Sequence, residues 1–110
     1  MIDQTIQEIE ARIHAAKHLS FLQKKELQIL VGNLKEEVTH LSQTHFDEAD
    51  SIASFAWLTA GEGLKDQANP KLMKIALDGI RASVEKFEKT HPGLTMTVNA
   101  ISTYFSNLGI

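Results

Sequence analysis

Apolar residues recur along four stretches of this chain with alternating spacings of four and three positions. Two stretches lie in the first half, Ile2 to Ile13 and Leu27 to Leu41, and two lie near the end, Met73 to Phe87 and Leu94 to Leu108. A period near 3.5 keeps one stripe of a helix against its neighbours along the whole helix. The pattern predicts an all-α fold, an antiparallel helical bundle of four main helices plus one short helix with coiled-coil-like packing.

Capping signals set the predicted boundaries of the first two helices. Ser20 and Gln23 are three positions apart and have the form of a capping box, so a helix is expected from this point to about residue 42. A helix over residues 2–17 precedes it. Gly32, inside the second helix, indicates either a local weakness or a close approach by another helix.

The last two helices are separated by a proline. Asn69 followed by Pro70 places an N-cap residue before a proline at the first helical position, and predicts a helix from there to about residue 89. His91 and Pro92 should end that helix, because the residue before a proline is disfavoured in the α region. The final helix is expected over residues 94–108, with Gly109 as a left-handed C-cap.

Residues 44–69 have the least regular pattern. Asp47 is predicted to cap a short helix that ends near Gly61, followed by a loop. The chain is therefore interpreted as a single domain, residues 1–110, in which an N-terminal hairpin (1–43) and a C-terminal hairpin (70–110) are joined by this segment.

The C-terminal quarter resembles a known family. Residues 84–95 read V-E-K-F-E-K-T-H-P-G-L-T, and the chain ends in L-G-I. This resembles small bacterial helical proteins whose pattern is F-E-x-x-H-P-x-L-T, then a short helix and an ending like L-x-x-G-I. That family is known only as a domain of unknown function, so the resemblance implies a small all-helical bacterial protein and no particular activity. Residues 44–69 do not follow the family and are interpreted as an insertion.

Composition narrows the possible functions. The net charge is −3 and the only basic doublet is Lys24-Lys25, so a nucleic-acid partner is not expected. The chain has no cysteine, which excludes thiol chemistry and favours a cytoplasmic location. No stretch of about 20 residues is apolar enough to span a bilayer, so no membrane insertion is expected.

Two Glu-x-x-His motifs raise the possibility of a metal site. Glu37 with His40, and Glu88 with His91, match the motif that ferritin-like bundles use to bind two metal ions. The apolar spacing opposes this hypothesis, because both glutamates flank the seam and His40 faces away from it. No cofactor is therefore expected, and a metal-binding bundle is kept as an alternative. No nucleophile, glycine-rich or nucleotide motif is recognisable, so the chain is predicted not to be an enzyme.

An uncharged segment favours protein contacts. Residues 51–61 carry no charge and include Trp57, and the last helix has small neutral residues at its polar positions. A self-associating module, a homodimer built through these two helices, is the preferred interpretation. A monomeric adaptor for another protein is the alternative, and simple core packing of Trp57 is the competing explanation. The residues predicted to make contacts are Phe55, Trp57, Leu58, Val98, Tyr104 and Phe105.

Overall fold

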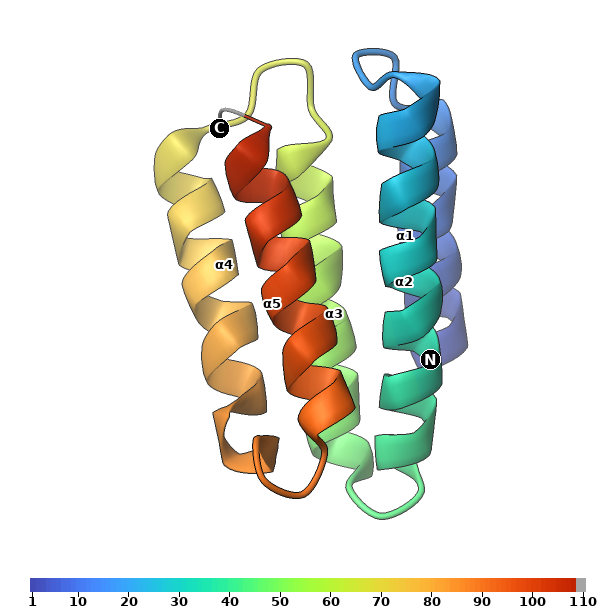
Figure 1. The fold of residues 1–110 in the computed structure, drawn as a ribbon, viewed down its shortest axis with the longest axis vertical. Coiled ribbons are helices and arrows are strands. Elements are labelled where there is room, and N and C mark those ends of the chain that lie inside the picture. The colour runs from blue at the N-terminus through green and yellow to red at the C-terminus, as the bar shows by residue number, and fades with distance from the viewer. Residues whose placement is uncertain (109–110) are drawn as a thin grey trace.

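The computed structural model describes residues 1–108 and confirms the all-α fold. Successive helices run in opposite directions, so the α1–α2 and α3–α4 connections lie at one end and the α2–α3 and α4–α5 connections at the other (Figure 1). A 3₁₀ turn, η1, follows α4. The elements are α1 (Ile2–Ala15), α2 (Phe21–Ser42), α3 (Phe46–Gly63), α4 (Pro70–Val84), η1 (Glu85–Phe87) and α5 (Pro92–Asn107).

Four of the helices form a ring. Each of α2, α3 and α4 packs against the next helix in sequence, and α5 closes the ring against α2. The first helix, α1, lies outside the ring and covers the groove between α2 and α3. The outer side of the α3–α4 pair has no corresponding cover among the described residues, and this difference shapes the surface discussed below.

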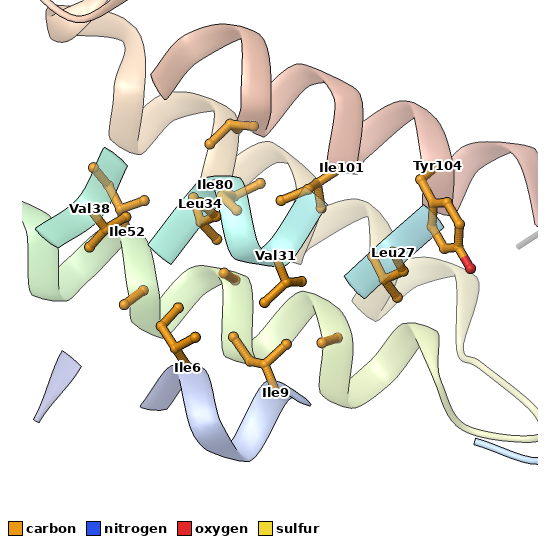
Figure 2. Packing of buried hydrophobic residues seen from close by; sticks show 14 of the residues in the cluster. Ile6, Ile9, Leu27, Val31, Leu34, Val38, Ile52, Ile80, Ile101 and Tyr104 are labelled. Atoms are coloured by element: carbon orange, nitrogen blue, oxygen red, sulfur yellow. The ribbon is translucent and has the colours of Figure 1, made fainter. Parts of the chain in front are cut away.

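The predicted seams form the core. Every seam position of α1 and α2 is buried, and in the C-terminal half only Leu77 and Leu108 are partly exposed. Side chains from all five helices meet along the bundle, and Figure 2 shows Ile6 and Ile9 of α1 against α3, with α2 and α5 beyond. Burying an aliphatic side chain of this size contributes about 1.5–3 kcal/mol, so these stripes account for the fold.

The third helix is longer than predicted. It has 18 residues and ends at Gly63, and its N-cap is His45 rather than Asp47. Asp47 lies instead in the first turn, where its charge complements the positive end of the helix. Gly61 does not end the helix, because α3 packs against α1, α2 and α4 over its length and this packing outweighs the glycine cost of about 1 kcal/mol.

Two helix starts have the predicted caps. Ser20 accepts a hydrogen bond from the N–H of Gln23, and the Gln23 side chain accepts one from the N–H of Ser20, which confirms the capping box. Asn69 accepts from the first two N–H donors of α4, and Pro70 occupies the first helical position. Both starts are fixed by local chemistry, as expected.

The α4–α5 corner differs from the prediction. The α-helix ends at Val84, before residue 89, and the tighter η1 turn brings Phe87 into the core. His91 is the N-cap of α5 and Pro92 its first residue, so α5 begins two residues earlier than Leu94. The proline pre-sets the helical φ and lacks the N–H that would have no partner there. The predicted cap at Gly109 lies outside the described residues.

Candidate functional site

Three of the predicted contact residues belong to the core. Val98, Tyr104 and Phe105 of α5 are buried within the single chain. The Tyr104 hydroxyl donates to the backbone carbonyl of Gln23 in α2 at 3.0 Å, which ties the two helices together. Within one chain these side chains are used in core packing, because the ring closes and α2 occupies that side of α5, so the surface described below does not include them.

Trp57 joins α3 to α1. Its ring packs against the core, and the Arg12 guanidinium lies over it with Cζ 5.3 Å from the ring centre. The indole Nε1 is buried, and it has no hydrogen-bond partner within residues 1–108. Trp57 is thus mainly a packing residue at the α1–α3 contact.

Phe55 lies on a different side of α3, next to α4, and Leu58 follows it by three positions and is exposed. A methyl group at Gly79 of α4 would lie 2.5 Å from the Phe55 ring, so this glycine lets the ring rest directly on the α4 backbone. Exposed apolar residues continue from this contact toward the α3–α4 connection, and Ile75 has 66% of its surface exposed. We call this surface the α3–α4 face, and it comprises Phe55, Leu58, Leu72, Ile75, Gly79 and Ala82.

The α3–α4 face is hollow at one end and raised at the other. An open hollow of about 730 Å³ lies toward the α2–α3 connection, with Phe55, Gly79 and Ala82 among its lining residues. At its rim Lys86 Nζ lies 3.8 Å from Glu48 Oε1. Leu58, Leu72 and Ile75 project from the other half. The same face therefore carries both apolar projections and a hollow.

The sequence of α4 contains a second, weaker stripe of apolar residues that corresponds to this face. Leu72, Ile75, Gly79 and Ala82 follow spacings of three, four and three, so they form a second stripe on α4 beside the core seam. Glycine and alanine contribute little to an apolar pattern, and half of the stripe therefore does not stand out. Only the position of Phe55 over Gly79 reveals that the stripe continues onto α3.

Only some of the four residues proposed as metal ligands lie close together. The rings of His40 and His91 lie 6.0 Å apart at the α4–α5 corner, and the Glu37 carboxylate lies against Gly93, where an added methyl group would be 2.5 Å from Oε1. Glu88 is exposed. Within residues 1–108 no three His, Asp or Glu side chains are grouped so that they could hold a metal ion. The arrangement does not supply the four glutamates and two histidines that point inward in such a site.

Two titrating groups are perturbed, and both have structural causes. The pKa of Glu62 lies below its ordinary value because its carboxylate accepts a hydrogen bond from the N–H of Asn69 and pairs with Lys65. Burial raises the pKa of Tyr104, with the charge of Glu26 as a smaller cause. Both shifts are explained by contacts that also serve the fold: a helix connection at Glu62 and the α2–α5 contact at Tyr104.

Comparison with known proteins gives no identification: no family model, no curated protein and no solved structure matches this chain. No helix of residues 1–108 is both long and apolar enough to cross a membrane.

Proposed function

We propose that this protein is a non-enzymatic module that self-associates through the α3–α4 face. The observation that carries the proposal is that projections and hollow occupy opposite halves of one face. A two-fold axis across that face places the projections of one copy over the hollow of the other, which is the self-complementarity a symmetric dimer requires.

Charge supports the same arrangement. The hollow is lined by two carboxylates, Glu48 and Glu85, and one cation, Lys86, while Lys71 lies beside the projecting residues and is exposed. The two-fold rotation brings Lys71 of each copy toward this rim, where the carboxylates outnumber the cation. Such complementarity speeds encounter and fixes the orientation more than it adds affinity.

The face is also large enough. A standard interface buries about 800 Å² on each partner, roughly an eighth of the 6531 Å² surface of this chain. Two adjacent helices about 22–27 Å long and about 10 Å wide offer an area of this order. An adaptor that uses the same face for a different protein is the alternative. The proposed location is the cytoplasm, and this part of the proposal rests on the lack of cysteine.

Light scattering behind a sizing column, over a hundredfold range of concentration, tests the proposal with one matched pair of variants. Ile75→Lys removes an apolar contact worth about 2–3 kcal/mol and places a charge in the interface. The dissociation constant should therefore rise at least about 100-fold. The control is Ile29→Lys on α2, because Ile29 is 57% exposed but lies off the α3–α4 face.

The proposal requires a dimer that Ile75→Lys dissociates and Ile29→Lys leaves intact. A monomer at every concentration would refute self-association and leave the adaptor alternative. A dimer that both variants preserve would place the interface elsewhere on the chain.

A further inference from the structure

Positive charge is concentrated at one end of the molecule. Residues 11–25 contain four Lys or Arg residues and no Asp or Glu, whereas the rest of the chain contains seven Lys or Arg and fourteen Asp or Glu. This segment spans the end of α1, the α1–α2 connection and the start of α2 (Figure 1). The opposite end carries the acidic first turn of α3, while Glu85 and Glu88 around η1 are balanced by Lys86 and Lys89. The protein is therefore an electrostatic dipole along its helices.

Two apolar side chains project within this basic segment. Phe21 and Leu22 are 76% and 75% exposed, and they are adjacent in the first turn of α2. The Ser20 capping box holds that turn. Lys25 Nζ lies 5.9 Å from the centre of the Phe21 ring, so the aromatic ring and the cation form one unit. Contiguous exposed apolar groups rimmed by polar residues mark interaction sites, and Phe21 and Leu22 have this setting.

The cations surround the apolar pair on the α1 side as well. An open hollow of about 410 Å³ is lined by His14, Phe21, Lys24, Lys25 and Gln28, with no acidic residue among them. Lys24 Nζ donates to the carbonyl of His14 at 2.9 Å, which holds this ammonium group at the hollow. Acidic groups at this end include Glu26, next in sequence to Lys25, and Asp66, whose Oδ1 lies 3.7 Å from His18 Nδ1.

We infer that this end of the molecule docks on the surface of an anionic phospholipid bilayer. The docking surface, which we call the basic tip, comprises Lys17, His18, Phe21, Leu22, Lys24 and Lys25. Phe21 and Leu22 enter the boundary between headgroups and acyl chains, and the lysines bind lipid phosphates around them. Lysine stems can follow the apolar side chains inward while their charges stay at headgroup level.

The apolar pair favours a bilayer over other anionic partners. A free phosphate or a nucleic-acid backbone would engage the lysines and leave Leu22 in water, and Leu22 has no flat face on which a base could stack. A bilayer presents negative charge above a hydrocarbon layer, in the same order in which the basic tip presents cations around projecting apolar groups. The inference does not depend on self-association, because the basic tip lies on α1 and α2.

Vesicle sedimentation tests the inference. The full chain is mixed with vesicles of phosphatidylcholine and phosphatidylserine at about 70:30, or with phosphatidylcholine alone. Binding should require the anionic lipid and weaken as salt is added. Lys24→Ala with Lys25→Ala should lower the partition coefficient about 25-fold, since each lysine near such a surface contributes roughly a factor of five. Phe21→Ser with Leu22→Ser should lower it at least about tenfold.

Matched controls come from the acidic end. Phe46 is 51% exposed at the start of α3, so Phe46→Ser removes a comparable side chain far from the basic tip. Lys86→Ala with Lys89→Ala removes two lysines there. Both controls should bind vesicles as the unaltered chain does. Helix content and the melting curve verify that each variant is folded, and the single variants Phe21→Ser and Leu22→Ser replace the double variant if it melts early.

Four results would overturn the inference. Equal binding to neutral vesicles, or no binding to either kind, would exclude docking on anionic lipid. Unchanged binding by a folded variant that lacks Phe21 and Leu22 would reduce the surface to a simple anion site. Tighter binding to a short oligonucleotide than to the anionic vesicles would assign the basic tip to nucleic acid.

Discussion

Gly63→Ala should destabilise the fold, and the structure sets the size of the effect. A methyl group at Gly63 would lie 2.5 Å from two ring carbons of Phe105 and 3.3 Å from Met73 Cε. Phe105 is only 1% exposed, so its ring cannot turn out into solvent to make room. Overpacking a core costs about 1–3 kcal/mol. Alanine returns at most about 1 kcal/mol of helix propensity, and less at a helix end. The expected net loss is about 1–2 kcal/mol.

Gly32→Ala is the matched control, because a methyl group there would meet no atom within 4 Å. Only the propensity gain remains in the middle of α2, so this variant should be more stable by about 0.5–1 kcal/mol. Urea unfolding, monitored by circular dichroism, gives the free energy of unfolding of both variants. In a thermal melt, each kcal/mol should move the melting temperature by about 4–8 °C. Equal stabilisation of both variants would show that the Phe105 ring yields to the new methyl group, and would refute the packing argument.

Two further predictions concern polar contacts. Tyr104→Phe removes the hydrogen bond to the Gln23 carbonyl and should cost about 1 kcal/mol at neutral pH, measured by urea unfolding. Burial raises the pKa of Tyr104 above 10.0, so the unfolded chain ionises first, and this tyrosine's contribution to stability should be present below pH 10 and fall above it. The pKa of Glu62 is instead lowered from 4.5 by the N–H of Asn69 and by Lys65, so its contribution is lost as the pH falls through and below that value. Glu62→Gln should flatten the acid side of the stability–pH curve, and an unchanged curve would contradict this assignment.

The core was predictable because each helix repeats one rule. Ile6, Leu34 and Ile101 are seam positions in the sequence and are buried in the structure. Caps such as Ser20 and Asn69 were predictable for a different reason. The hydrogen bonds that fix them join residues no more than three positions apart. The length of α3 was not predictable in this way. Its glycines are unfavourable locally, and the packing that compensates comes from three helices distant in sequence.

The candidate site was harder to predict than the core. Phe105 is a seam position and Leu58 is not, but an apolar side chain can pack within the chain or against a second molecule, so the pattern did not show which of the two residues is available for contacts. The choice depends on ring closure by α2 and α5, which buries Phe105 and leaves Leu58 exposed. The basic tip required the fold for a related reason. The turn from α1 into α2 is what brings Lys24 Nζ to the carbonyl of His14, beside the Phe21 ring and Lys25.

The two proposed surfaces have a joint geometric consequence. The basic tip lies at one end of α1 and α2, and the α3–α4 face runs along the side of the bundle, so neither surface covers the other. A two-fold axis across the α3–α4 face turns the copies end for end, because it must bring the projections of each over the hollow of its partner. The basic tips then point in opposite directions. One copy is enough for attachment to a bilayer, whereas a dimer built in this way would present one basic tip to each of two apposed bilayers. Clustering of anionic vesicles therefore requires both surfaces, and a chain that carries Ile75→Lys would still bind vesicles but would not draw them together.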